Sequence, residues 1–511
     1  MIASDDSSPQ VNSGYYLANP GLTQCRAVGL HDILSSGMSD VSILDYAFLA
    51  FESESSPKHV AGLQIFELPD GASDDFVARL APAIKNVELK APLNQKLESS
   101  MLGMPQWVED TEIDLDCHIH YEAATAPRTL QQILREVEDL HAEGLDRSAP
   151  LWQLHIFDRL EGRRFAIYFK IHHAYMDGIS LSRRTLSSLS EDPDDGELGT
   201  YWGFECDDRQ QARESLLGQL LGTARSAGKA ALVLPGLAKL GLKHGLKLLH
   251  LGGDSLPVPF TAPRTAFNTP LTPERSVAIL DLPLARVRKV AQHAAVTVND
   301  VLLELCDQAM TRYLDDQGGA PDEPLVAQMP VSLRRPDASQ GNQITIAILE
   351  LGSKETNPIR RLQDIHGHTT GVKHELSEMT PETAETYTVL MQGIAQFGES
   401  LGIGGVIPPL GNVVISNVIG PKRRLYLCGA PLVAVYPIST IAPSLAMNVT
   451  MYTYMDSIHI GIVAGYSAIP DLEPIASNLK LALGDLETAM GIASNRRKTR
   501  AGTRPSAKQQ V

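Results

Sequence analysis

Apolar residues recur at every second position in the segment that leads to a histidine doublet, and this alternation predicts a β-strand. Between residues 163 and 171 the pattern places phenylalanine and isoleucine on one face of the pleat. Continuing the period of two places His173 on this apolar face and His172 on the opposite face. Gly178 then permits a turn that most residues resist, and a helical pattern follows from 179 to 189. The doublet is therefore expected at the end of a strand.

The same periodicities divide the chain into two mixed halves. Residues 39–190 contain a predicted strand at 59–66 and a predicted helix at 129–137. Residues 263–490 contain predicted helices at 283–295, 298–314 and within 358–398, and predicted strands near 411–418, 431–435 and 445–462. Strands mixed with helices in this way predict an α/β fold with α+β layering, built from two halves.

The residues between the two halves differ in composition. An acidic loop at 191–197 opens the segment 191–262, which we expect to be a helical connector, and no acidic residue occurs from 225 to 253. In that stretch Lys239, Lys243 and Lys247 fall on one helical stripe beside leucines. This helix either lies on an anionic membrane surface or is an ordinary connector whose lysines reach solvent along their apolar stems.

Both ends of the chain are expected to be unstructured. Residues 1–38 are rich in Ser, Asp and Gly and lack the basic start and apolar run of a signal peptide. Translation from Met38 is a hypothesis that N-terminal sequencing of the native protein would test. Residues 491–511 form a basic tail, which would add a second weak contact to anionic lipid.

Composition narrows the function classes. The net charge of −16 repels nucleic acid, and no zinc-finger spacing or basic aromatic stripe offsets it. The five cysteines stand singly, which predicts reduced thiols in the cytosol. Two uncharged stretches, 400–421 and 428–455, are long enough to cross a bilayer, but their prolines favour buried strands instead. We therefore expect an intracellular protein with no nucleic-acid partner.

His173 and Asp177 form the outline of an acid/base site, and the alternative interpretation is a buried histidine near a surface aspartate. No third ligand for a metal is adjacent, and the three histidines between residues 366 and 374 fit a solvated helix face better than a metal site. Residues 398–402 have the Gly-x-Ser-x-Gly spacing of serine hydrolases, but a helical pattern precedes them where that motif needs a strand. No phosphate loop or dinucleotide motif is present. The remaining chemistry is removal of a proton by His173 from a bound hydroxyl or amine.

Residues 172–178 resemble the His-His-x-x-x-Asp-Gly motif of CoA-dependent acyltransferases, the superfamily of chloramphenicol acetyltransferase and of peptide-synthetase condensation domains. Further blocks, in the family's order, narrow the resemblance to the bacterial bifunctional wax ester synthase/diacylglycerol acyltransferases. These blocks are residues 44–49 with 57–60, then 150–152, 299–302, 330–334, 341–342 and 416–421. Ile419 stands where that family usually has proline, which leaves the selectivity for acyl chain or acceptor open.

The resemblance implies two chloramphenicol acetyltransferase-like halves joined by a helical connector, with an active-site tunnel between them. His173 would be the general base, and Asn299 would donate a hydrogen bond to the thioester oxygen. The structural members of the motifs would be His172, Asp177 (paired with an unidentified arginine), Gly178 and Asp300. The remaining substrate-site candidates are Glu52, Pro150, Leu151, Trp152, Ser416 and Asn417.

The family implies transfer of a fatty acyl group from acyl-CoA to a long-chain alcohol, giving a wax ester, or to diacylglycerol, giving triacylglycerol. Acyl-CoA is then a substrate, and we expect neither a cofactor nor a metal. A lipid acceptor also leads us to expect a cytoplasmic protein in peripheral contact with an anionic inner membrane or a lipid inclusion. Two alternatives stay open: a lipid-binding protein of the same fold without turnover, and an acyltransferase that takes its acyl group from a carrier protein.

Overall fold

The computed structural model describes residues 39–492 except 42, 100–104, 177, 197, 199–257, 333–343, 353–354 and 401–405. The chain divides into two units, residues 1–38 and 39–511, and only the second is described below. The lysine stripe predicted within 225–253 lies outside the described residues, as do the N-terminal extension and nearly all of the C-terminal tail.

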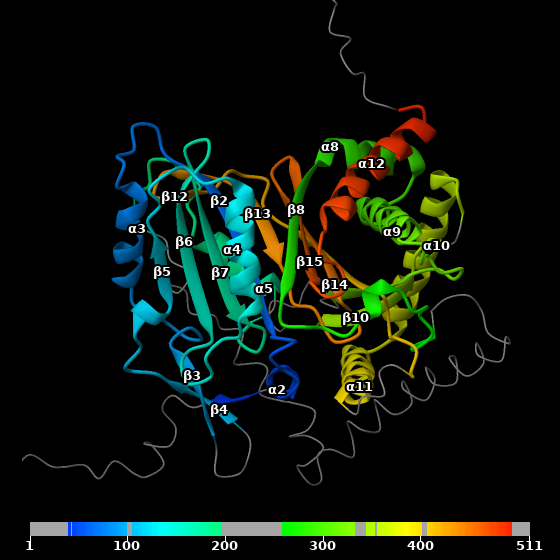
Figure 1. The fold of residues 1–511 in the computed structure, drawn as a ribbon, viewed down its shortest axis with the longest axis horizontal. Coiled ribbons are helices and arrows are strands. Elements are labelled where there is room, and N and C mark those ends of the chain that lie inside the picture. The colour runs from blue at the N-terminus through cyan, green and yellow to red at the C-terminus, as the bar shows by residue number, and fades with distance from the viewer. Residues whose placement is uncertain are drawn as a thin grey trace, which may run out of the picture. The chain divides into compact units, whose positions relative to one another are not determined.

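Two six-stranded sheets form the framework of this unit (Figure 1). The first sheet contains, in spatial order, β12 (Tyr426–Leu427), β13 (Ala430–Ile438), β2 (His59–Glu67), β7 (Arg164–His172), β6 (Trp152–Leu160) and β5 (Ile119–Glu122). The second contains β10 (Ile344–Glu350), β9 (Val326–Ser332), β11 (Val413–Ile419), β14 (Met447–Tyr454), β15 (Ser457–Gly465) and β8 (Arg275–Pro283). A small third sheet joins β1 (Ser39–Asp40), β4 (Pro105–Glu109) and β3 (Gln95–Ser99).

The α-helices of the described residues are α2 (Ile43–Ala50), α3 (Phe76–Lys85), α4 (Leu130–Ala142), α5 (Gly178–Ser187), α8 (Leu284–Ala294), α9 (Val298–Asp316), α10 (Pro358–Glu378), α11 (Pro381–Ser400) and α12 (Glu473–Ala489). The helices predicted to begin at residues 129, 179, 283, 298 and 358 begin within one residue of those positions, and α2, α3 and α12 were not predicted. Thr129 caps α4 and Thr297 caps α9, each through a capping box in which its side chain accepts a backbone N–H three residues later. The long helical region predicted within 358–398 is two helices, because α11 restarts at Pro381.

The strand that leads to the histidine doublet is buried on both faces. The predicted apolar face, which includes Phe165 and Ile171, is buried in β7 as expected. The opposite face is buried too, because helix α4 packs over it, and even Lys170 is fully buried. Its Nζ donates to the carbonyl oxygens of Leu140 and Glu143, and burial lowers the pKa of Lys170 to about 8. A central strand of this kind holds the doublet rigidly.

The chain crosses between the two sheets in its second half. After β11 it leaves the second sheet, adds β12 and β13 to the edge of the first sheet, and returns as β14. Strand β13 pairs antiparallel with β2, so that Ile438 faces Ala61. At the crossing the backbones of β13 and β15 approach so closely that a Cβ on Gly461 would lie 1.8 Å from the carbonyl oxygen of Pro437. The periodicity of residues 431–435 predicts a strand there but carries no information about which sheet it joins.

The two sheets meet through a shared apolar cluster. Side chains from β2, β7 and β13 of the first sheet and from α4 pack there against Val277 of β8 and Val463 of β15. Helices α8, α9, α10 and α12 pack on the other face of the second sheet (Figure 1). None of the helices in the described part of the chain combines the length and apolarity that a bilayer crossing requires.

Candidate active site

The histidine doublet lies where β7 ends and a tight turn begins. His172 is the last residue of β7 and pairs with His59, the first residue of β2. The backbone N–H of His173 donates to the carbonyl oxygen of Lys58 at 2.7 Å. The N–H of His172 donates to the carbonyl oxygen of Leu151 at 2.9 Å. The residues that immediately precede the two neighbouring strands, β2 and β6, therefore hold the doublet through backbone bonds.

The two imidazoles have different surroundings. His172 is 0% exposed, and its Nδ1 accepts the N–H of Ala174 at 3.0 Å. In the neutral ring the proton therefore lies on Nε2, which is 3.4 Å from Oε1 of Glu52. His173 is only partly buried, and its ring stacks on Phe48 of α2, with ring centroids 4.1 Å apart. Of the two imidazole-bearing residues, only His173 keeps part of its surface exposed.

Glu52 connects the doublet to two other segments. Its carboxylate accepts the backbone N–H of Lys58 at 3.0 Å and the Nη2 of Arg147 at 2.8 Å. The same Nη2 donates to the carbonyl oxygen of Leu49, at the end of α2. Burial alone would raise the pKa of Glu52, but the contact with His172, the Lys58 N–H and Arg147 lower it to about 2. Glu52 is therefore an anion that supports His172 and links α2 to the doublet.

The depressed pKa of Glu52 predicts a pH-dependent contribution to stability. The unfolded chain protonates this carboxyl near its ordinary value of 4.5, whereas the folded protein protonates it near about 2. The stabilisation is complete above about 4.5 and is lost as the pH falls toward 2. Between pH 5 and pH 3 the wild type should lose about 2 kcal/mol more unfolding free energy than Glu52→Gln, measured by urea titration. Equal losses in the two proteins would contradict this assignment.

Asn299 and Asp300 open helix α9, and their side chains have separate roles. Asp300 is fully buried, accepts the N–H of its N-cap Thr297 at 2.8 Å, and bonds His366 at 2.8 Å and Thr369 at 2.7 Å on α10. Burial raises the pKa of Asp300, but these hydrogen bonds outweigh burial and lower it. Asp300 therefore joins α9 to α10.

Asn299 contacts another of the predicted site residues. The Nδ2 of Asn417, on β11, donates to Oδ1 of Asn299 at 3.4 Å. Because its oxygen is engaged in this way, the amide nitrogen of Asn299 is the group left for another partner. Ser416 precedes Asn417 on β11 and is half-buried, opposite Thr450 of β14. The structure thus brings together two sequence blocks that lie more than a hundred residues apart.

Residues 150–152 lie inside the first half. Trp152 is fully buried, and its Nε1 donates to the carbonyl oxygen of Leu93 at 2.8 Å. The carbonyl oxygen of Leu151 accepts a hydrogen bond from the N–H of His172, and the N–H of Leu151 donates to the hydroxyl of Tyr175 at 3.0 Å. Pro150 is buried beside them. These contacts support the turn that carries the doublet, while contact of these three residues with substrate stays a prediction.

Three structural features of the site had little or no signal in the sequence. Phe48 belongs to a recognised block, but its stacking on His173 could not be inferred from it. Arg147 follows α4 in an ordinary loop and matches no motif. His366 was expected on a solvated helix face, and this expectation is wrong for its Nδ1, which bonds Asp300.

Asp177 lies outside the described residues, so its pairing with an arginine stays a prediction, and Gly178 begins α5.

No group of three or more histidine, cysteine or carboxylate side chains suited to a metal occurs among the described residues. Helix α11 runs up to Ser400, so the Gly-x-Ser-x-Gly spacing at residues 398–402 follows a helix. The nucleophile turn of serine hydrolases instead follows a strand, and the spacing is therefore not that motif.

Comparison with known proteins gives consistent matches along the chain. The family model described as the wax ester synthase/diacylglycerol acyltransferase catalytic domain matches residues 41–302, and the model of the C-terminal domain matches residues 340–487. A Mycobacterium tuberculosis protein named diacylglycerol O-acyltransferase is 35% identical over 460 residues, which cover 88% of this chain and 100% of the relative. Another protein from that organism, also named diacylglycerol O-acyltransferase, is 33% identical over 467 residues, which cover 89% of this chain and 98% of the relative.

Solved structures agree with these matches. The wax ester synthase/diacylglycerol acyltransferase of Marinobacter aquaeolei VT8 has a TM-score of 0.68 and 31% identity, covering 89% of this chain and 100% of its own. The first condensation domain of the CDA synthetase has a TM-score of 0.54 at 16% identity, covering 90% and 98%, which shows a shared fold alone. The fold class predicted from the sequence is therefore confirmed.

Proposed function

The chain belongs to the wax ester synthase/diacylglycerol acyltransferase family and is an O-acyltransferase, and we propose that His173 is its general base. The observation that carries this proposal is the contrast within the doublet. His172 is enclosed and faces Glu52, whereas His173 is partly exposed and is held by its backbone and by the ring of Phe48. A positioned imidazole that a substrate can reach is the arrangement that general-base catalysis needs.

The proposed reaction is a direct transfer between two bound substrates. The imidazole of His173 takes the proton of the acceptor hydroxyl while the oxygen attacks the thioester carbonyl of acyl-CoA. The carbon–sulfur bond then breaks, the new ester forms, and the CoA sulfur receives the proton from His173. Asn299 is proposed to donate its amide N–H to the carbonyl oxygen as that oxygen gains charge. Its contact with Asn417 supports this role, because it orients the amide.

Acyl-CoA is the proposed donor, and the acceptor is a diacylglycerol or a long-chain alcohol. The names of the relatives support these substrate classes. The test incubates the purified protein with palmitoyl-CoA and either dioleoylglycerol or hexadecanol, and measures free CoA thiol together with the lipid product. Acceptor-dependent release of CoA supports the proposal. No release with either acceptor would instead indicate a lipid-binding protein, and activity confined to a carrier-protein thioester would indicate a different donor.

Peripheral contact with an anionic membrane or lipid inclusion is also proposed, because the acceptors dissolve in lipid. The lysine stripe at residues 239–247 supports it, since each cation near an anionic surface contributes about 1 kcal/mol. Changing Lys239, Lys243 and Lys247 to glutamate should abolish co-sedimentation with phosphatidylserine vesicles. The matched control changes three exposed lysines elsewhere, Lys373, Lys422 and Lys480, to glutamate. Equal binding by both triple variants would contradict the proposed surface.

A further inference from the structure

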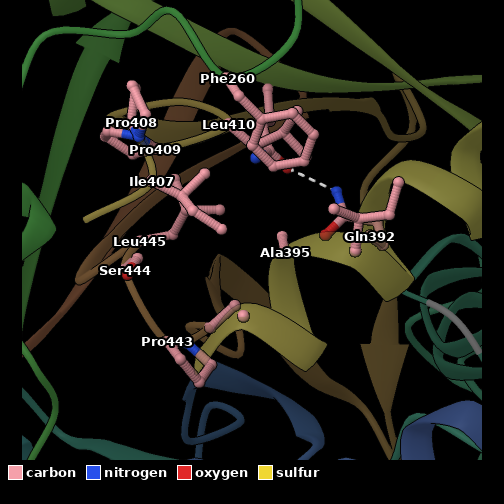
Figure 2. Close-up of a pocket in the computed structure, with 14 residues that line it drawn as sticks. Phe260, Gln392, Ala395, Ile407, Pro408, Pro409, Leu410, Pro443, Ser444 and Leu445 are labelled. Atoms are coloured by element: carbon pink, nitrogen blue, oxygen red, sulfur yellow. Dashed lines mark hydrogen bonds between the residues drawn. The ribbon is translucent and has the colours of Figure 1, made fainter. Parts of the chain in front are cut away.

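A pocket lies between helix α11 and the turns that precede β11 and β14 (Figure 2). The empty space among its lining residues measures about 520 Å³, a figure that includes open solvent beyond the pocket. Most of its wall is apolar, formed by side chains such as Phe260, Ala395, Ile407, Leu410, Pro443 and Leu445. A pocket of this composition suits a hydrocarbon chain.

Two buried asparagines hold the turns that form the wall. The Nδ2 of Asn268 donates to the carbonyl oxygens of Gly411 at 2.9 Å and Ser444 at 2.7 Å. The Nδ2 of Asn412 donates in turn to Oδ1 of Asn268 at 2.8 Å. One hydrogen-bonded pair thus fixes both turns, so the pocket is built into the fold.

The residues that line the pocket include two glutamines, Gln328 and Gln392. Gln328 of β9 is 2% exposed, and its Oε1 accepts from Nε2 of Gln392 on α11 at 2.8 Å (Figure 2). The Nε2 of Gln328 is also buried, and no atom of the described residues accepts a hydrogen bond from it. A buried donor without an acceptor is unfavourable, so an acceptor oxygen brought within reach of this amide would stabilise it.

The pocket wall and the doublet are attached to the same loop. The turn at residues 442–445 follows Thr440, whose Oγ1 donates to the carbonyl oxygen of Pro57 at 2.9 Å. The carbonyl oxygen of the next residue, Lys58, accepts a hydrogen bond from the N–H of His173. The segment that leads into the pocket wall and the turn that carries the doublet are therefore hydrogen-bonded to two adjacent residues, Pro57 and Lys58.

We propose that this pocket binds one acyl ester of a diacylglycerol acceptor, with the alkyl chain along the apolar wall and the ester carbonyl oxygen accepting from Nε2 of Gln328. The inference rests on the proposed acyl transfer and adds the basis of its acceptor selectivity. A diacylglycerol carries two ester carbonyls besides its hydroxyl. A fatty alcohol has a single oxygen, which must lie at His173, so it gains nothing from the glutamine.

The first test compares the two acceptors in Gln328→Leu. The KM for dioleoylglycerol should rise about tenfold, because a buried hydrogen bond to the ester is lost, while the KM for hexadecanol stays unchanged. Gln292→Leu, on the exposed face of α8, is the matched control and should change neither value. An equal rise for both acceptors would overturn the proposal, since it would mean that the pocket holds the acyl chain of the donor. No change for either would also overturn it, leaving the pocket to water.

Ala395→Phe provides a second test, because it fills the pocket without removing a polar group. It should lower kcat/KM with dioleoylglycerol more than tenfold relative to hexadecanol, and equal losses would overturn the proposal. Thermal unfolding of each variant checks that it is folded. Wild-type protein that releases no CoA with hexadecanol or dioleoylglycerol would refute the proposed function itself, whereas normal turnover by both variants with both acceptors would refute only this assignment of the pocket.

Discussion

Replacing His173 with alanine should lower kcat by about 10²- to 10⁴-fold and leave the folded state intact. The side chain is partly exposed and stacks on Phe48, so its removal uncovers little buried surface. The loss would come from the missing proton acceptor, because no other imidazole of the doublet can replace it. His172 is enclosed, with Nδ1 bonded to the Ala174 N–H and Nε2 facing Glu52.

His172→Ala is the paired variant and should behave differently. Removing a fully buried side chain that faces a carboxylate should cost about 2 kcal/mol of unfolding free energy, with a smaller fall in kcat. The measurements are CoA release at saturating acceptor and urea unfolding of both variants. Wild-type turnover by His173→Ala, or a larger loss of kcat in a folded His172→Ala, would refute the assignment of the base.

Replacing Gly461 with alanine should destabilise the protein by about 3 kcal/mol or prevent folding. The added Cβ would lie 1.8 Å from the Pro437 carbonyl oxygen, and both atoms belong to backbone, so neither can move aside without shifting a strand. The shift would separate β13 from β15, where the crossover strand of the first sheet lies on the second sheet. Urea unfolding measures the effect.

Gly484→Ala is the control for this change. Gly484 lies in helix α12, and nothing lies within 4 Å of an added Cβ, so alanine should stabilise the protein by about 0.5–1 kcal/mol through higher helix propensity. Unfolding free energies that move in opposite directions would support the close approach of the strands. If Gly461→Ala unfolds at the same urea concentration as wild type, the crossover does not pack as described.

Much of the fold could be predicted because local patterns reflect local structure. Alternation found β7 and its histidine doublet, and helical periodicity found α4 and α9, whose capping threonines the structure then showed. The acyltransferase family and activity, inferred from collinear motifs, are confirmed by the matches to known proteins. Prediction failed where a residue's environment depends on distant segments. Lys170 sits on a strand face that alternation alone cannot show to be buried, and His366 lies on a helix whose partner is elsewhere in the chain.

The sequence by itself determined β7, α4, α9, the doublet and the reaction class, because periodicity and motif chemistry are properties of neighbouring residues. Only the tertiary structure decided how the two histidines differ. Glu52 meets Arg147, 95 residues away, and together they tie α2 to the doublet so that Phe48 lies on His173. The transfer of β13 to the first sheet was likewise decided only by tertiary packing. Such contacts arise from long-range burial and strand pairing, whose energies depend on which surfaces meet in space and are absent from any local pattern.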